Sequence, residues 1–363
     1  MKSVRLSAVG DILLTGTVVE MIRNKGPKEP FIFVLEELEK SDLVFGNLEC
    51  PLSNRGDPLK NKCCLYSSPE TVKSLKSAGF NVLSLANNHI FDYGYEGFED
   101  TIYLLKENNI SWFGAGKNWE EARMPAILSI NNLSIGFLGY SWDFIGSINA
   151  TKSNFGTAPL NEKLILEDVK NLKEKADIVI VSLHWGYDRE CYPLPSQRKL
   201  AQGIIDAGAS LVLGHHPHVL QGIEKYDNGI IGYSLGNFIF PDVSYKHYNL
   251  VQKPENKESI IFSCEISKNG IEDFDIIPIK SNNQFQPKIL KNKEKELILK
   301  KIENLSEGFK NFKNYSTFWN KNRTRKDLPA IITASKTFNV AIYKVYQTKI
   351  LCKSIIRKIV LRR

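Results

Sequence analysis

Histidine is scarce in this sequence, yet most of the histidines stand where predicted strands end, beside Asn, Gly or Trp. The chain of 363 residues has six histidines. Five of them follow short apolar runs, namely His89, His184, His215, His216 and His218. Neutral imidazole is the commonest protein ligand for borderline transition metals, and carboxylate or amide oxygens complete such sites. The pattern predicts a divalent-metal site, whereas His247, in a polar run, is interpreted as a structural residue.

The densest cluster is the segment Gly214-His215-His216-Pro217-His218. If the segment is extended, side chains two residues apart point the same way, so His216 and His218 present their rings together. Gly214 and Pro217 are expected to fix a tight turn that brings the backbone close to an ion. A polar loop with incidental histidines is the alternative, and three histidines in four residues argue against it.

Acidic and amide side chains follow three earlier apolar runs. They are Asp11, Asn47 with Glu49, and Asn88 next to His89. Two of these residues have alternative interpretations. Asp11 could cap a helix over Thr15–Arg23, and Asn47 could simply stabilise a turn.

The elements that carry these residues alternate along the chain, which is typical of a layered α/β domain with a partly parallel sheet. The predicted strands are Val4–Val9, Leu43–Phe45, Asn81–Leu85, Leu133–Gly139, Ile178–Leu183, Leu211–Leu213 and Ile230–Ser234. The predicted helices are Glu70–Ala78, Tyr95–Asn108, Glu162–Lys175 and Ser196–Ala207. Ligands of open α/β sheets gather at the carboxyl ends of strands, so the polar clusters are expected to converge on one crevice.

The end of the chain is predicted to differ from the rest. Residues 259–279 suggest two strands around an Asn269-Gly270 turn, which would end a domain spanning residues 1–280. Residues 281–328 are interpreted as a peripheral connection with a helix near Glu294–Asn304. Residues 329–363, which contain eight basic residues and no acidic one, are predicted to form a C-terminal helical extension.

The composition, with 42% hydrophobic and 24% charged residues, favours a globular protein over a disordered or multi-span membrane protein. Asp11 interrupts the N-terminal apolar stretch before a signal peptide could form, so a cytoplasmic location is expected. The six cysteines show no regular spacing, which argues against a disulfide scaffold.

Five segments, in chain order, resemble the motifs of calcineurin-like metallophosphoesterases. They are Val9-Gly10-Asp11, Gly46-Asn47-Leu48-Glu49, Asn87-Asn88-His89, Leu183-His184-Trp185-Gly186 and the Gly214–His218 cluster. Together with Tyr233–Phe238 and Val219–Gln221, their amino-acid sequences are similar to those of the CapA family, which is named for poly-γ-glutamate capsule synthesis. The resemblance covers about residues 3–280. It implies a layered metallophosphoesterase-like β-sandwich flanked by helices.

The resemblance also implies a ligand set. A first ion would be held by Asp11, Glu49 and His218, and a second by Glu49, Asn88, His184 and His216. The ions would be manganese, iron or zinc. Two departures from the broader metallophosphoesterase pattern leave a one-ion site open beside the two-ion site: Leu13 stands where that pattern has a histidine, and Glu49 where an aspartate is usual.

His89 is left free by this assignment and would act in proton transfer. Asp92 would hold its imidazole in the productive tautomer, or would instead cap a helix starting near Gly94. Glu190 resembles a family acid, although a surface position is equally compatible with the sequence. The function expected is that of a metal-dependent hydrolase of phosphoester bonds that acts in capsule or extracellular polymer biosynthesis. Hydrolysis or transfer at an amide or acyl bond, and a non-catalytic metal-binding subunit, are the alternatives.

The expected substrates are a polymer precursor or a phosphoester. A further expected partner is the inner membrane face. Apolar and basic residues alternate within 329–363 as in an amphipathic helix, which could bind an anionic membrane surface or pack on protein. Nucleic acid is disfavoured, because no aromatic stacking platform accompanies the charges.

Overall fold

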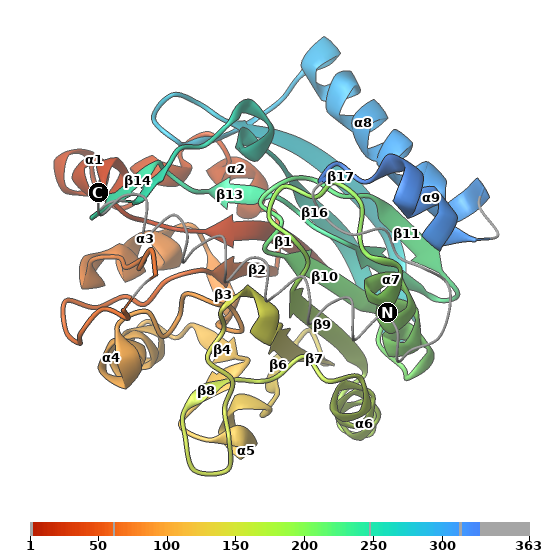
Figure 1. Cartoon of the computed structure of the whole chain (residues 1–363), viewed down its shortest axis with the longest axis horizontal. Helices are drawn as coiled ribbons and strands as arrows, with labels where there is room; N and C mark the ends of the chain where they lie inside the picture. The colour runs from red at the N-terminus through yellow and green to blue at the C-terminus, as the bar shows by residue number, and fades with distance from the viewer. Residues whose placement is uncertain (1–2, 61, 247, 312–313, 327–363) are drawn as a thin grey trace, which may run out of the picture.

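The computed structural model describes residues 3–60, 62–246, 248–311 and 314–326, and Figure 1 shows their arrangement. Two β-sheets pack face to face, and helices cover both outer faces. The predicted layered α/β sandwich with flanking helices is therefore confirmed.

The first sheet is mixed, with the strand order β18-β17-β16-β1-β2-β3-β4, and β13 also pairs with β1. Its strands are β1 (Val4–Ile12), β2 (Leu43–Leu48), β3 (Phe80–Ser84), β4 (Ser111–Phe113), β13 (Asn237–Ile239), β16 (Glu258–Ser267), β17 (Gly270–Ser281) and β18 (Pro287–Ile289). Strands β13, β1, β2, β3 and β4 run parallel to one another, whereas β16 is antiparallel to β1, β17 to β16 and β18 to β17. The carboxyl ends of β1, β2 and β3 consequently lie at one edge.

The second sheet has the order β11-β12-β10-β9-β7-β6. Its strands are β6 (Ala126–Ile130), β7 (Leu133–Ser141), β9 (Ile178–His184), β10 (Leu211–His215), β11 (Ile223–Tyr226) and β12 (Gly229–Gly232). The central strands β7, β9, β10 and β12 are parallel, and antiparallel β6 and β11 form the edges. Two short ribbons pair β5 (Ala115–Gly116) with β8 (Gly156–Thr157), and β14 (Val243–Tyr245) with β15 (Tyr248–Leu250).

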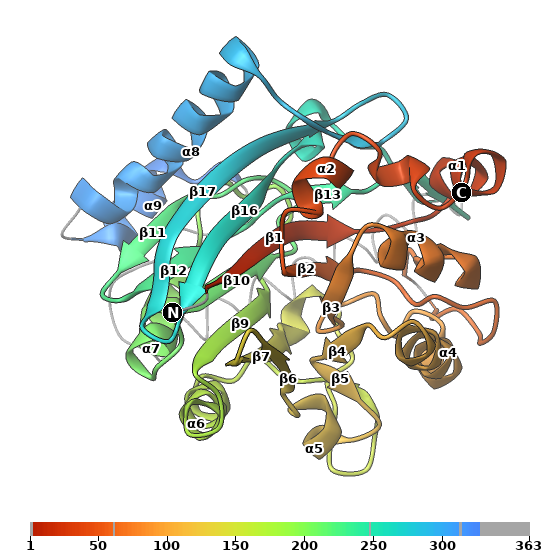
Figure 2. The same ribbon diagram turned by 180° about the vertical axis from the view of Figure 1, so that it is seen from behind.

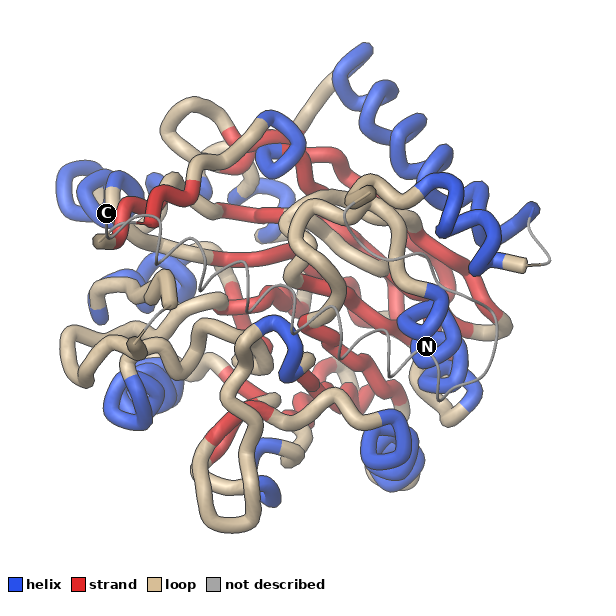
Figure 3. Tube along the Cα trace, viewed as in Figure 1, coloured by secondary structure: helices blue, strands red, loops and turns tan. Residues whose placement is uncertain are grey.

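Most α-helices of the described residues lie on the two outer faces, as Figures 2 and 3 show. They are α1 (Thr17–Lys25), α2 (Leu35–Leu38), α3 (Val72–Ser77), α4 (Gly94–Glu107), α5 (Trp119–Ala122), α6 (Glu162–Lys173), α7 (Pro195–Asp206), α8 (Asn292–Asn311) and α9 (Tyr315–Asn322). Helices α1 to α4 bury their apolar faces on the first sheet, and α6, α7 and α9 do so on the second. A third apolar cluster fills the space between the sheets.

Each predicted strand and each of the four predicted helices has a counterpart in the structure, with ends that differ by a few residues. The predicted Asn269-Gly270 turn joins β16 and β17, where Ser267 pairs with Gly270. Strand β13 was not predicted. It pairs with β1 because Gly10 and Gly236 approach closely: a Cβ on Gly10 would lie 1.9 Å from the carbonyl oxygen of Gly236.

The described part of residues 281–328 packs against the sandwich. Helix α8 is longer than predicted, and Ile298, Ile302 and Leu305 join the cluster between the sheets. Trp319 of α9 is buried in the cluster beneath α6 and α7. Residues 329–363 and His247 lie outside the described residues, so the predicted division of the chain stays a prediction. No helix in the described part of the chain is long and apolar enough to span a bilayer.

Candidate metal centre

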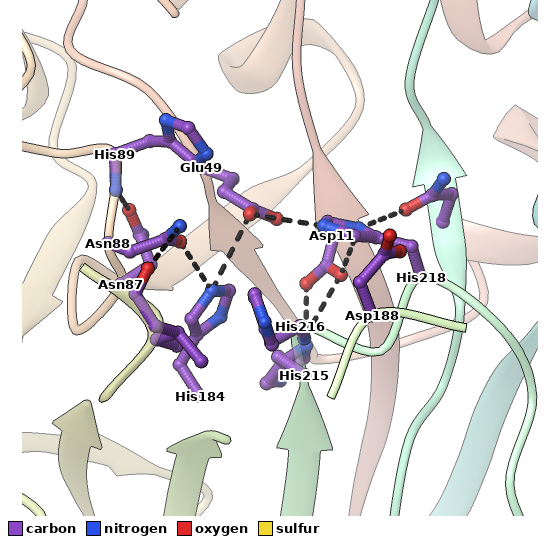
Figure 4. Close-up of polar contacts among 12 residues, drawn as sticks. Asp11, Glu49, Asn87, Asn88, His89, His184, Asp188, His215, His216 and His218 are labelled. Atoms are coloured by element: carbon purple, nitrogen blue, oxygen red, sulfur yellow. Dashed lines mark hydrogen bonds and ion pairs between the residues drawn. The ribbon is translucent and has the colours of Figure 1, made fainter. Parts of the chain in front are cut away.

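The predicted polar residues converge where the two sheets present the carboxyl ends of their parallel strands. Asp11 on β1 is in register with Asn47 on β2, and His184 on β9 is in register with His215 on β10. Figure 4 shows Asp11, His184 and His215 directed toward a common space, with the Glu49 carboxylate between Asp11 and His184. The strand-end residues of both sheets thus converge on one buried site.

Glu49 is the most unusual group in this space. Its side chain is wholly buried, and neither carboxylate oxygen has a hydrogen-bond partner among the described residues. The Oε1 atom lies 3.5 Å from His184 Nε2 and 3.6 Å from His218 Nε2. Burial raises the pKa of Glu49 well above its usual range. A buried carboxylate without a partner is costly, so this position is suited to a cation.

The donor atoms around Glu49 are spaced as metal ligands would be. Glu49, His184 and His216 form one group, and Asp11, Glu49 and His218 form another, each with donor atoms within 4.8 Å of one another. The amide oxygen of Asn88 lies 2.9 Å from His184 Nε2. Donors about 2.1 Å from one ion would stand about 3.0–3.4 Å apart in octahedral or tetrahedral geometry. The residues present therefore fit a divalent transition metal ion.

His218 is held so that its Nε2 atom faces Glu49. Its Nδ1 atom lies 2.9 Å from Asn237 Oδ1 and 3.2 Å from Asp11 Oδ2, an arrangement that favours the proton on Nδ1. Burial by itself would lower the pKa of His218, but the Glu49 and Asp11 carboxylates raise it to about 10. Asn237 in turn donates to Gln252, which fixes the direction of its oxygen.

Asp11 is surrounded by nitrogen atoms. Its Oδ1 atom accepts a hydrogen bond from Asn47 Nδ2 at 2.9 Å and lies 3.2 Å from His215 Nδ1. Its Oδ2 atom accepts the backbone N–H of His216 at 3.3 Å. Burial would raise the pKa of Asp11, but His215 and His218 lower it well below its usual range. Asp11 thus organises the histidine cluster besides being a candidate ligand.

The Gly214–His218 segment departs from the extended conformation predicted for it. Strand β10 ends at His215, and the backbone of His216 (φ 91°) and His218 (φ 56°) is in the left-handed region. Such angles are rare for non-glycine residues and occur most often where a site requires them. The two rings nevertheless lie together, with centroids 5.5 Å apart. Gly214 has a different role from the one predicted, since a Cβ there would lie 1.8 Å from the carbonyl oxygen of Tyr233.

His89 and Asp92 form a hydrogen-bonded pair beside the metal ligands. His89 Nδ1 lies 2.6 Å from Asp92 Oδ2. Asp92 is buried, which would raise its pKa, yet His89 and Lys62 hold that pKa below its usual value. Burial lowers the pKa of His89 even against the opposing charge of Asp92.

The helix-cap alternatives for two residues are wrong. Helix α4 follows Tyr93 and α1 follows Gly16, and at neither end does a described side chain accept a capping hydrogen bond. Asp92 and Asp11 instead bond within the site. The turn interpretation of Asn47 is also wrong, because Asn47 lies in β2 and bonds to the side chains around it.

Three residues of the site were missed by the sequence analysis. Asn87 donates to Asn47 Oδ1 at 3.2 Å, and Asn237 supports His218; both stand in segments that the family resemblance includes, which was a usable signal. Lys62 gave no signal, because it lies in a polar loop whose sequence suggests a solvated surface. Its Nζ atom nevertheless lies 2.6 Å from Asp92 Oδ1.

Glu190 lies outside the donor groups. It is buried, and its two oxygens accept the backbone N–H groups of Thr324 at 2.9 Å and Arg325 at 2.8 Å. The surface interpretation of Glu190 is therefore wrong. Its hydrogen bonds hold Thr324 and Arg325, which follow α9, against the loop between β9 and α7. Leu13, which the sequence analysis set against a histidine of the broader metallophosphoesterase pattern, is buried among apolar residues.

Known proteins resemble this chain at several levels. The family described as "Bacterial capsule synthesis protein PGA_cap" matches residues 5–242. Capsule biosynthesis protein CapA of Bacillus anthracis is 36% identical over 283 residues, which cover 76% of this chain and 66% of the relative. PGA biosynthesis protein CapA of Bacillus subtilis is 35% identical over 277 residues, covering 75% and 70% of the two chains. The chain thus spans about two thirds of the length of these curated relatives.

Among solved structures, a 5'-nucleotidase precursor from Thermus thermophilus aligns with a TM-score of 0.45 at 12% identity, covering 84% of this chain and 58% of that one. The sequence relationship is the stronger one, because the family match extends through β1, β2, β3, β9 and β10, whose ends carry the candidate ligands. On that evidence, the chain belongs to the bacterial capsule synthesis protein family PGA_cap.

Proposed function

We propose that this protein is a metal-dependent hydrolase of phosphoester bonds that acts in the synthesis of a capsule or another extracellular polymer. The observation that carries the proposal is the buried, unpartnered Glu49 carboxylate among imidazoles, next to the His89–Asp92 pair. The names of the Bacillus relatives support the polymer pathway.

The residues that would hold metal belong to two overlapping groups that share Glu49. They are Glu49, Asn88, His184 and His216 for one ion, and Asp11, Glu49 and His218 for a second. Imidazole with carboxylate and amide oxygen suits manganese, iron or zinc. The chemistry that such ions supply is polarisation of the ester and a lowered pKa for an attacking water molecule.

The contribution of His89 is proton transfer to the leaving oxygen. Asp92 accepts a hydrogen bond from Nδ1, so it stabilises the protonated ring and leaves Nε2–H as the group that donates to the substrate. His89 is not a member of either donor group, so its proton is not displaced when those residues bind metal. A well-placed general acid contributes about 10²–10⁴-fold in rate.

A direct test compares substrates of different bond type. Protein reconstituted with manganese, iron or zinc would be assayed with an aryl phosphate monoester, an aryl phosphate diester and a glutamyl anilide. We expect turnover of a phosphate ester that requires metal and falls in His89→Gln. Turnover of the anilide alone would replace the phosphoesterase by an amide hydrolase. Metal binding without turnover of any substrate would indicate a non-catalytic subunit.

We also propose that residues 329–363 attach the protein to an anionic membrane surface where polymer precursors are made. Each basic residue near the headgroups contributes about 1 kcal/mol. Flotation with vesicles of increasing anionic lipid content would show binding that rises with lipid charge and falls with salt. If a chain ending at residue 328 floats as well as the full chain, the tail has no such role.

A further inference from the structure

A lysine outside the predicted site reaches the proton-transfer pair. Leu59, Lys62 and Leu65 lie against the loop that carries His89 and Asp92. The side chain of Lys62 is 20% exposed, and its Nζ atom lies 2.6 Å from Asp92 Oδ1. The same ammonium group donates a hydrogen bond to the backbone carbonyl of Asn88. Lys62 therefore joins a candidate metal ligand to the partner of the candidate acid.

Two backbone hydrogen bonds accompany this contact. The N–H of Leu65 donates to Asp92 Oδ2 at 2.7 Å, and the N–H of Leu59 donates to the backbone carbonyl of Asp92 at 2.8 Å. Almost any residue could supply such backbone bonds. The ammonium group of Lys62, by contrast, depends on the side chain, and it places a positive charge 2.6 Å from a buried carboxylate oxygen.

The two oxygens of Asp92 have separate partners. Oδ2 faces His89 Nδ1 and the N–H of Leu65, while Oδ1 faces Lys62. Oδ1 accepts no hydrogen bond from a described residue, and the Lys62 ammonium group is the positive charge that faces it. Without that charge, rotation of the carboxylate would turn Oδ2 away from the imidazole. The backbone carbonyl of Asn88 would also lose its hydrogen bond from Lys62. Asn88 is the residue whose side-chain amide oxygen lies 2.9 Å from His184 Nε2.

We propose that Lys62 is a positioning residue for proton transfer, fixing the Asp92 carboxylate so that the ring of His89 is held toward the leaving group. This inference rests on the proposed hydrolase function. The ammonium group acts through Asp92 and Asn88 and does not itself contact the reacting atoms.

The kinetic test uses Lys62→Met, which keeps the length of the side chain but not its charge, and Lys62→Arg, which restores a cation. Lys60→Met is the matched control, because Lys60 is exposed in the same loop. Each metal-loaded protein would be assayed with two phosphate esters. The leaving group of the 4-nitrophenyl ester departs readily without a proton, whereas the leaving group of the phenyl ester needs one. We expect Lys62→Met to lower kcat for the phenyl ester by about tenfold or more and for the nitrophenyl ester by less than about threefold. KM and bound metal should not change, and Lys62→Arg should recover most of the rate.

A second measurement is independent of turnover. In zinc-loaded protein, the His89 Nδ1 proton can be observed by NMR and assigned by its loss in His89→Gln. We expect Lys62→Met to speed its exchange with water by about tenfold, whereas Lys62→Arg and Lys60→Met leave it slow. If the wild-type protein hydrolyses no substrate, but the His89 proton still exchanges faster in Lys62→Met than in the other two variants, the hydrolase proposal fails and the positioning role stands. Equal rate losses for both esters, or a His89 proton unaffected by Lys62→Met, would overturn the inference.

Discussion

Replacing Glu49 by glutamine should make the metal-free protein more stable while abolishing stabilisation by metal. Glu49 is wholly buried, and its oxygens have no hydrogen-bond partner among the described residues. A buried polar group without a hydrogen-bond partner lowers the free energy of unfolding by about 1–3 kcal/mol, and a charged group lowers it more. Glu49→Gln removes that charge. We therefore expect the free energy of unfolding in chelator to rise by about 1–3 kcal/mol at neutral pH.

The gain should depend on pH in a defined direction. Burial raises the pKa of Glu49 in the folded protein, so its stabilising contribution is complete below the unfolded-state pKa and is lost as pH rises through the folded-state value. The advantage of Glu49→Gln should thus be absent at acid pH and appear as pH rises above about 4.5. Adding metal should reverse the order, because an ion at about 100 times its Kd stabilises the wild type by about 2.7 kcal/mol.

Urea unfolding with and without chelator measures both effects, and Glu39→Gln is the control because Glu39 is exposed. If Glu49→Gln is less stable than the wild type in chelator across the pH range, the cost assigned to the buried carboxylate is wrong. A variant that metal stabilises as much as the wild type would remove Glu49 from the ligand set.

Three other predictions concern the site and its support. His89→Ala should keep its bound metal and lose turnover, whereas His216→Ala should lose both; elemental analysis showing equal metal loss would remove His89 from the acid role. Metal binding should release protons near neutral pH, because the carboxylates raise the pKa of His218 to about 10, and calorimetry in buffers of different ionisation enthalpy would detect them. Glu224→Gln should lower the unfolding free energy by about 3 kcal/mol without changing bound metal, because Arg198 would lose the carboxylate 2.6 Å away; an unchanged urea midpoint would contradict this.

Much of the fold could be predicted because the sequence carries strong local signals. An apolar, β-branched run such as Ile178–Leu183 is typical of a strand that is buried on both faces of a sheet. Strand β9 is such a strand, because all its residues are buried and it lies between the parallel strands β7 and β10. Strand β13 could not be predicted in the same way. Its three residues pair with β1 only because two glycines, distant in sequence, let the backbones approach.

The candidate site was accessible from sequence where residue type and strand-end position coincided. His184 and Glu49 are examples, since each follows an apolar run that forms a parallel strand. The backbone of His216 and His218 was mispredicted because left-handed angles are imposed by tertiary contacts and leave no trace in residue spacing. Lys62 was missed because a lysine in a polar loop has the same sequence signature whether it faces water or a buried carboxylate.

The central claim is that Glu49 and its neighbouring histidines bind a divalent metal ion. Anomalous diffraction from crystals of manganese-loaded protein tests it most directly. The account predicts an anomalous peak about 2.0–2.3 Å from a Glu49 oxygen and from nitrogens of His184 and His216, with or without a second peak beside His218. Well-diffracting, manganese-saturated crystals with no peak between these three side chains would contradict it.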